Sequence, residues 1–330
     1  MFRSLRGLIA ASFVVAAPIA FAGPYSSLVV FGDSLSDGGN NSIIFDTSFG
    51  GARTPTPISS PGFIPTFTYT PSNRYSNGPV WVETVASVLG VPLAPSLAGG
   101  TNWAFGGATT GPISASLTSP FPASLLTQAA FYLGSTGGVA SSSALYVIAG
   151  GGNDARAVLN GLAPAATTII NYASNTTFIL NELYAAGARN FLVVNTPDVG
   201  KTPALQSLGA VATATASGLT ALMNAQLNAS IAGLAAGLRS GIRLLDAYAL
   251  VDSVFATPSA FGISDATSAC AFTCVAGAAS TFFWDGIHPT AAGHLVIANV
   301  ALRLVPEPAM LALLAVMFCG LVVARRRAAR

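Results

Sequence analysis

The chain of 330 residues contains two histidines, His288 and His294, so any proton transfer by an imidazole falls to one of them. His288 stands in the run Asp285-Gly-Ile-His288-Pro289. A carboxylate three residues before a histidine can bond to Nδ1, fix the tautomer and leave Nε2 free to accept a proton from a serine. His294 has no such partner and falls inside the last predicted helix. The spacing therefore predicts that His288 is a general base and that Asp285 orients it.

The serine that such a base would serve follows an apolar run. Residues 27–31 (SLVVF) are typical of a buried strand, and Gly-Asp-Ser at 32–34 comes next. Two more predicted strands end in turn-forming residues, at 106–107 and at 152–154. Ligands bind beyond the carboxyl ends of the strands in an open parallel sheet, so we expect these three ends to converge. Ser34 would then be the nucleophile of an acyl-transfer site.

The other polar residues near these strand ends have structural interpretations. Asp33 is expected to accept hydrogen bonds from nearby backbone N–H groups in its turn. Asp154 is expected to cap the helix that follows the third strand, and Asn77 to cap an earlier one. His294 is interpreted as structural. No Gly-x-Gly-x-x-Gly follows a strand, which argues against a dinucleotide site.

The strands and helices that must position these residues alternate along the chain. This alternation favours an α/β fold with a parallel sheet. The predicted strands lie at 27–31, 102–105, 145–149, 192–195 and 242–246, and the clearest helices at 79–89, 204–238 and 289–302. The segment 50–79 is rich in proline and glycine, with aromatic residues between them. Loops of this length are often functional, and we expect this one to line a substrate cleft.

Four short motifs in this chain resemble, in order, the conserved blocks of the GDSL or SGNH hydrolases. They are Phe-Gly-Asp-Ser-Leu-Ser-Asp at 31–37, Asn-Trp-Ala-Phe-Gly-Gly-Ala at 102–108, Gly-Asn-Asp at 152–154 and Asp-Gly-Ile-His-Pro at 285–289. The form around 283–290 is closest to the bacterial lipase, phospholipase and haemolysin-like branch. The resemblance covers residues 28–300 and implies a flavodoxin-like three-layer α/β/α sandwich around a five-stranded parallel sheet.

This resemblance implies an esterase or lipase that needs no metal or cofactor. It assigns Ser34 as nucleophile, His288 as general base and acid, and Asp285 as the residue that orients the histidine. It also implies an oxyanion hole made by the backbone N–H of Ser34, the backbone N–H of Gly107 and the side-chain amide of Asn153. Because Gly106 and Gly107 are adjacent, either could present the backbone donor.

Composition and charge exclude other classes of protein. Hydrophobic residues make up 52% of the chain and charged residues 8%, which excludes intrinsic disorder. The net charge is +2, but residues 23–304 hold eight basic and eleven acidic residues and are therefore net −3. With a single lysine and no basic stripe in that region, the chain is not expected to bind nucleic acid.

The N-terminus predicts export. Arg3 and Arg6 precede an uncharged apolar run and a small-x-small pattern at 20–22, as in a secretory signal peptide spanning residues 1–22. The remaining body, 23–304, would be the hydrolase domain. An even pair of cysteines in an exported body suggests a disulfide between Cys270 and Cys274.

The C-terminus, residues 305–330, resembles a PEP-CTERM sorting signal. Pro-Glu-Pro at 306–308 precedes an uncharged stretch at 309–324 and three arginines at 325–327. An ordinary C-terminal anchor is the alternative interpretation. The resemblance implies transient anchoring in the inner membrane of a Gram-negative bacterium, cleavage by an exosortase, and release to the periplasm, outer surface or extracellular matrix.

The sequence thus predicts an exported serine hydrolase that acts on carboxylic esters. The substrate could be a lipid, a short-chain acyl ester or an O-acetylated polysaccharide. Two alternatives stay open at this point. One is a non-catalytic surface-display or adhesive protein on a hydrolase scaffold, and the other is an acyltransferase of the same family.

Overall fold

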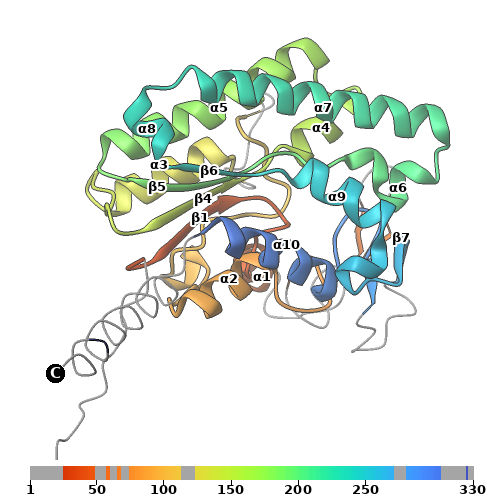
Figure 1. The fold of residues 1–330 in the computed structure, drawn as a ribbon, viewed down its shortest axis with the longest axis horizontal. Helices are drawn as coiled ribbons and strands as arrows, with labels where there is room; N and C mark the ends of the chain where they lie inside the picture. Colours follow the sequence, from red (N-terminus) through yellow and green to blue (C-terminus); the bar gives the residue numbers. More distant parts are fainter. Residues whose placement is uncertain are drawn as a thin grey trace, which may run out of the picture.

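The computed structural model describes residues 25–48, 57–59, 65–67, 74–112, 123–270, 280–305 and 325. Its main sheet has four parallel strands in the order β1-β4-β5-β6 (Figure 1). These are β1 (Leu28–Gly32), β4 (Leu145–Ala149), β5 (Asn190–Val194) and β6 (Ile242–Leu245). Two small sheets pair β2 (Pro57–Ser59) with β3 (Pro65–Phe67), and β7 (Asp265–Ala269) with β8 (Thr281–Phe283).

The fifth strand expected at 102–105 is an extended segment at the edge of this sheet. Three backbone hydrogen bonds hold it beside β1: Val30 N to Thr101 O at 3.0 Å, Trp103 N to Val30 O at 2.8 Å, and Phe105 N to Gly32 O at 3.1 Å. The segment therefore occupies the expected fifth position without forming a regular strand. Its end delivers Gly106 and Gly107 next to the end of β1.

Helices cover both faces of the sheet, so the predicted three-layer sandwich is confirmed (Figure 1). One face carries α1 (Asn40–Ser48), α2 (Trp81–Leu89) and α10 (Ala291–Leu304). The opposite face carries α3 (Leu125–Ser135), α4 (Gly152–Leu159), α5 (Ala165–Ala185), α7 (Ala210–Ala232) and α8 (Ala236–Ser240). The short α6 (Pro203–Gln206) and α9 (Ala247–Ala256) lie on the side where the strands end.

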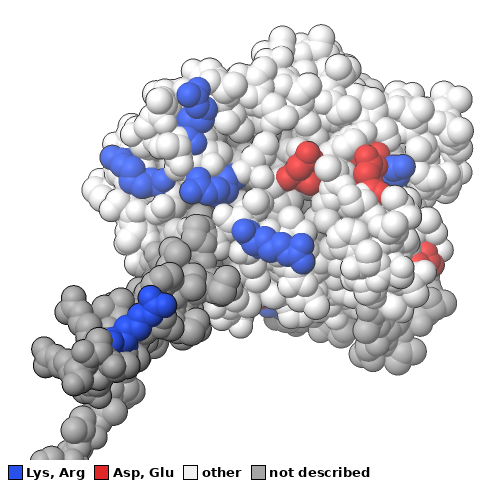
Figure 2. Space-filling view, viewed as in Figure 1, with Lys and Arg blue, Asp and Glu red and all other residues white. Residues whose placement is uncertain are grey.

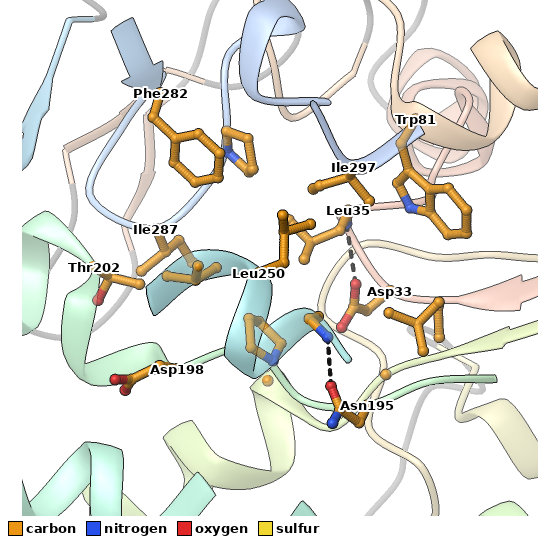
Figure 3. A pocket seen from close by; sticks show the side chains of 18 of the residues that line it. Asp33, Leu35, Trp81, Asn195, Asp198, Thr202, Leu250, Phe282, Ile287 and Ile297 are labelled. Carbon is orange, nitrogen blue, oxygen red and sulfur yellow. Dashed lines mark hydrogen bonds between the residues drawn. The ribbon is translucent and has the colours of Figure 1, made fainter. Parts of the chain in front are cut away.

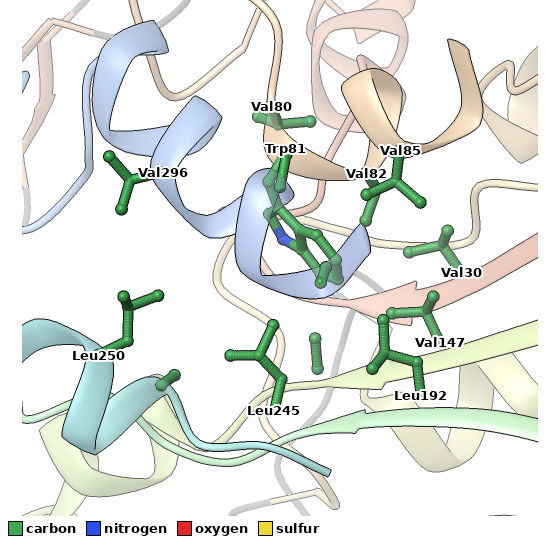
Figure 4. Packing of buried hydrophobic residues seen from close by; sticks show 14 of the residues in the cluster. Val30, Val80, Trp81, Val82, Val85, Val147, Leu192, Leu245, Leu250 and Val296 are labelled. Atoms are coloured by element: carbon green, nitrogen blue, oxygen red, sulfur yellow. The ribbon is translucent and has the colours of Figure 1, made fainter. Parts of the chain in front are cut away.

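Alternation along the strands divides the core into two apolar layers. Val30 and Val147 face α2 and α10, where they pack with Trp81 (Figure 4). Their neighbours Phe31 and Ile148 face the opposite helices. Each fully buried side chain of this kind stabilises the fold by roughly 1.5–3 kcal/mol. Burial on both faces is why these strands read as continuous apolar runs in the sequence.

The predicted helix at 204–238 is wrong in its continuity, because it is three helices. The first helix, α6, ends at Gln206, and Gly209, with φ +87°, is the N-cap of α7. Gly233 then closes α7, and α8 is a separate short helix. The apolar periodicity runs through both breaks, which is why it does not reveal them.

Two predicted helix starts also differ from the structure. Asn77 does not cap α2; its side-chain oxygen accepts a hydrogen bond from Ala291 N, at the start of α10, at 2.7 Å. At α2 the Glu83 carboxylate bonds back to Val80 N at 2.9 Å. Pro289 lies before α10, whose N-cap is Thr290. The helix end expected at Gly90 is confirmed, with φ +69°.

Several predictions fall outside the described residues. These include the signal peptide at 1–22, the motif at 306–308 and the apolar stretch at 309–324. Cys270 is disulfide-bonded, whereas Cys274, its predicted partner, lies outside the described residues. No helix within the described ranges is long and apolar enough to cross a membrane. Charged side chains are sparse on the face seen in Figure 2, as the composition leads one to expect.

Candidate active site

Ser34, His288 and Asp285 meet at the carboxyl edge of the sheet. Ser34 lies in the turn after β1, and its Oγ is 2.9 Å from Nε2 of His288. The Nδ1 atom of the same ring is 2.7 Å from Oδ2 of Asp285. The three residues are 8%, 4% and 2% exposed, so the bonds are shielded from bulk water. The structure therefore brings together the three residues predicted from the sequence, in the predicted order.

The carboxylate of Asp285 also stabilises the backbone turn that contains His288. Oδ1 of Asp285 accepts hydrogen bonds from the backbone N–H groups of Ile287, at 2.8 Å, and His288, at 2.7 Å. Trp284 N also donates to His288 O at 2.7 Å. One carboxylate oxygen of Asp285 thus fixes the backbone while the other holds the imidazole.

The turn that presents Ser34 is held by the residues beside it. Asp33 accepts a hydrogen bond from Leu35 N through Oδ1 at 3.0 Å, which confirms its predicted role in the turn. Burial raises the pKa of Asp33 to about 6, and the nearby His288 opposes this shift. The side chain of Gln128 pairs with both the N–H and the carbonyl oxygen of Gly32, each at 2.8 Å. The end of β1 is therefore fixed on both sides of the sharp turn.

The choice between Gly106 and Gly107 is decided by their hydrogen bonds. Gly106 N donates to Oδ2 of Asp37 at 3.0 Å, and a Cβ at Gly106 would lie 2.1 Å from the ring of Tyr75. Gly107 adopts φ +85°, and its N–H has no acceptor among the described residues. The same holds for the N–H of Ser34 within those residues. Gly107 is therefore the glycine whose N–H can serve a ligand.

Asn153 lies at the start of α4 with its amide held at both ends. Nδ2 donates to Ala108 O at 2.9 Å, and Oδ1 accepts from Nη1 of Arg156 at 3.3 Å. One Nδ2 hydrogen therefore remains for a further acceptor. Burial lowers the pKa of Arg156, while Asp285 and Asp33 favour its charged form.

The interpretation of Asp154 as a helix cap is wrong. The N-cap of α4 is Gly151, which makes no side-chain cap bond. Asp154 instead accepts from Oγ1 of Thr110 at 2.6 Å and from Thr110 N at 3.0 Å. This long-range contact ties α4 to the loop that carries Gly107. Burial raises the pKa of Asp154, and the bonds from Thr110 oppose the shift.

No role was predicted for Asn40 or Asn41, and Tyr75 was expected only as part of the aromatic segment 50–79; the structure places all three around the site. Tyr75 stacks on His288, with ring centroids 5.1 Å apart and an interplanar angle of 30°. Asn41 Nδ2 donates to Tyr75 Oη at 2.7 Å and to Gly106 O at 2.9 Å. Asn40 Nδ2 donates to the carbonyl oxygens of residues 102 and 104. These bonds link α1 to the edge segment and position the glycine loop.

Tyr75 belongs to the aromatic segment expected to line a cleft; it contacts His288 but is not among the lining residues of the pocket beside Ser34, so the expectation stays a prediction. Phe63 and Tyr69 of the same segment lie outside the described residues. The structural interpretation of His294 is confirmed: it is fully buried, and its Nδ1 accepts from Trp81 N at 3.3 Å. Burial lowers the pKa of His294 to about 3. Within the described ranges no cluster of three metal-ligating side chains is found.

Ser34 and His288 open into a pocket of about 470 Å³. Asn153 and Arg156 line one part of it, and Pro197, Leu205 and other mostly apolar residues line the rest. A reacting carbonyl carbon in this pocket would have the Ser34 hydroxyl on one side. The donors available to its oxygen would be the backbone N–H groups of Ser34 and Gly107 and the side-chain amide of Asn153, which all follow the carboxyl ends of strands or of the edge segment. The arrangement is suited to nucleophilic attack on an acyl group.

Comparisons with known proteins agree with this chemistry. The family model described as GDSL-like lipase/acylhydrolase matches residues 28–301. Esterase EstA of Pseudomonas aeruginosa is 30% identical over 96% of this chain and 53% of its own length. Lipase 1 of Photorhabdus luminescens is 32% identical over 62% of this chain and 28% of its own length. The chain thus spans about half the length, or less, of these curated relatives.

Among solved structures, a catalytic mutant of Axe2, an acetylxylan esterase from Geobacillus stearothermophilus, is 15% identical to this chain. It aligns with a TM-score of 0.40 over 84% of this chain and 92% of its own. The family match is far broader than any single motif, since it runs from the first strand into the last helix and takes in every residue of the site. The chain belongs to the family of GDSL-like lipases and acylhydrolases.

Proposed function

We propose that this protein is an exported serine esterase that hydrolyses carboxylic esters through an acyl-enzyme on Ser34. The observation that carries the proposal is the continuous hydrogen-bonded line from Ser34 Oγ through His288 to Asp285, at 2.9 and 2.7 Å. Ser34 and His288 line one pocket with Asn153, and the backbone N–H groups of Ser34 and Gly107 have no acceptor among the described residues. The relatives named esterase and lipase support the same class of reaction.

In the proposed reaction Ser34 Oγ attacks the carbonyl carbon of the ester while its proton passes to His288 Nε2. The resulting oxyanion accepts hydrogen bonds from Ser34 N, Gly107 N and Asn153 Nδ2. Collapse breaks the bond to the alcohol, which takes the proton from His288. A water molecule then attacks the acyl-enzyme, again with His288 as base, and the carboxylic acid leaves. Asp285 holds the tautomer that leaves Nε2 able to accept.

Labelling with a fluorophosphonate probe tests the nucleophile directly, because only an activated serine reacts. We expect one label on the purified full-length protein, located at Ser34 by peptide mass spectrometry, and loss of hydrolysis of p-nitrophenyl butyrate in proportion to labelling. Ser36 is the internal control and should stay unlabelled. It is fully buried, and its Oγ accepts a hydrogen bond from Trp81 Nε1 at 3.2 Å. An unlabelled protein, or one labelled without losing activity, would support the non-catalytic display scaffold instead.

Replacing Asn153 with alanine is expected to lower kcat about 10²–10³-fold with a smaller change in KM, because one oxyanion donor is lost. Steady-state kinetics on p-nitrophenyl butyrate measures the effect. Asn181→Ala, on an exposed turn of α5, removes the same side chain away from the site and should leave kcat unchanged. Equal kinetics in the two variants would remove Asn153 from the oxyanion hole.

Export is proposed on the sequence alone, from the signal peptide at 1–22 and the sorting motif at 306–308. An exosortase would be the processing partner, and the mature protein would reach the periplasm, cell surface or matrix. The intact mass of the protein recovered from a Gram-negative host that has an exosortase tests both ends at once. A mass equal to that of the full chain would contradict the proposed processing.

A further inference from the structure

The side-chain amide of Asn153 is the one proposed oxyanion donor that can point the wrong way. The other two donors, Ser34 N and Gly107 N, are backbone groups whose directions are set by the turns that carry them. The amide can rotate about its last side-chain bond, and its two ends have opposite hydrogen-bonding character. A reversed amide would present its oxygen instead of its nitrogen to the negative charge of the oxyanion. The reaction therefore depends on what holds the amide in place.

Two neighbours fix the orientation of this amide. At one end, Nδ2 donates to the carbonyl oxygen of Ala108, the residue after Gly107, at 2.9 Å. At the other end, Oδ1 accepts from Nη1 of Arg156 at 3.3 Å. A carbonyl oxygen can only accept and a guanidinium can only donate, so the reversed amide would have two repulsive contacts in place of two hydrogen bonds. Arg156 follows Asn153 by three positions in α4, a spacing that places both side chains on one face of the helix.

The guanidinium of Arg156 also brings a positive charge to the oxygen of the amide. Burial lowers the pKa of Arg156, but Asp285 and Asp33 favour its charged form, and an arginine is not deprotonated in proteins. The two carboxylates come from the turn of the base and from the turn after β1, where Asp33 accepts from Leu35 N (Figure 3). A charged donor on the amide oxygen draws electron density from the amide nitrogen, so the remaining N–H becomes a stronger donor.

We propose that Arg156 is a positioning residue of the oxyanion hole, which holds the Asn153 amide with its nitrogen toward the substrate and strengthens it as a donor. The inference rests on the proposed esterase function and adds a residue to its machinery. Arg156 lines the same pocket as Ser34, Asn153 and His288. Its effect on the reaction passes through the amide and requires no contact with the substrate.

A role of this kind affects the rate of reaction rather than the binding of substrate. The oxyanion forms twice, first when Ser34 attacks the ester and again when water attacks the acyl-enzyme. Asn153 donates to it both times, so a weakened amide slows both steps together. The expected result is a lower kcat with little change in KM. A residue that only packs in the pocket wall would change KM or the melting temperature instead.

The test is a double-mutant cycle on the full-length protein, with kcat and KM measured on p-nitrophenyl butyrate. Arg156→Met should lower kcat about tenfold, the effect of losing one hydrogen bond to a charged group. In the Asn153→Ala background the same substitution should change kcat less than about twofold, because the amide through which Arg156 acts is gone. Arg239→Met is the matched control, since Arg239 is exposed on α8, which precedes β6 at the amino edge of the sheet. It should leave kcat unchanged in both backgrounds.

Arg156→Lys provides a second cycle, which also covers the case that the methionine variant does not fold. Lysine keeps a positive charge near Asp33 and Asp285, so this variant should stay folded. Its ammonium lacks the fixed plane of the guanidinium and holds the amide less well. We expect a smaller loss of kcat than methionine causes, and again no further loss when Asn153 is alanine.

An equal loss of kcat with and without the Asn153 amide would overturn the inference, because Arg156 would then act independently of that amide. An unchanged kcat in every Arg156 variant that folds would also overturn it. The inference falls as well if Asn153→Ala keeps the wild-type kcat. These three results leave the esterase function standing, whereas absence of hydrolysis by the wild-type protein contradicts the function itself.

Discussion

Replacing His288 with alanine is expected to lower kcat about 10⁶-fold, the size of loss seen when the base of a serine hydrolase triad is removed. Nε2 of His288 is the base that lies within hydrogen-bond distance of Ser34 Oγ, at 2.9 Å. Without it the hydroxyl keeps its proton and the leaving alcohol finds no acid. KM should change little, because the pocket walls remain. Steady-state kinetics on p-nitrophenyl butyrate, with a melting curve to confirm folding, provides the measurement.

His294→Gln is the matched control for this experiment, since it removes the other imidazole. His294 is a buried residue of α10, and its Nδ1 accepts from Trp81 N at the start of α2. Losing that contact should cost roughly 1–3 kcal/mol of unfolding free energy and leave kcat intact. If instead His288→Ala kept wild-type turnover while His294→Gln abolished it, the assignment of the base would be wrong.

The residues that carry out the chemistry could be predicted because their signals are local. Asp285 and His288 are three residues apart and fold onto each other through one carboxylate. Ser34 is the second residue after β1, a strand that is buried on both faces. The family motifs then add the order of the blocks. Such short-range patterns can be recognised in a single sequence without knowledge of the tertiary fold.

The residues that position the chemistry could not be predicted, because their partners are far away in the chain. Asn41 bonds to Tyr75, 34 positions away, and to Gly106, 65 positions away. Gln128 pairs with Gly32 across 96 positions. A buried asparagine or glutamine looks the same in sequence as an exposed one. A faint signal existed for Asn40 and Asn41, since two adjacent asparagines are unfavourable inside a helix unless they serve its start or another backbone.

The errors in local structure have the same origin. Asp154 satisfies the pattern of a helix cap, yet its carboxylate bonds to Thr110, 44 positions earlier, because that contact closes the glycine loop. Asn77 fits the cap of α2 but binds Ala291 at the start of α10. In both cases a tertiary acceptor or donor competes successfully with the local one. A capping residue in the sequence therefore indicates that its side chain will accept a hydrogen bond from a backbone N–H group, but it does not identify that group.

The second large effect is expected for Asp285→Asn, which should lower kcat by up to about 10⁴-fold while the protein stays folded. The reason lies in the two bonding roles of the carboxylate. Oδ1 accepts from two backbone N–H groups, so the amide oxygen of asparagine would keep that position. The amide NH₂ would then face Nδ1 of His288, where Oδ2 now lies at 2.7 Å. Nδ1 must accept from it, the ring proton moves to Nε2, and Nε2 can no longer take the proton of Ser34.

Asp285→Ala separates this tautomer effect from the loss of the carboxylate itself. Alanine leaves the imidazole free to choose either tautomer, so its kcat should exceed that of the asparagine variant. It also leaves the backbone donors of Ile287 and His288 without an acceptor, so its melting temperature should be the lower of the two. Turnover and stability are thus expected to rank the two variants in opposite orders. If asparagine were the more active as well as the more stable variant, the carboxylate would act through the backbone turn alone, and the role of Asp285 in fixing the tautomer would have to be abandoned.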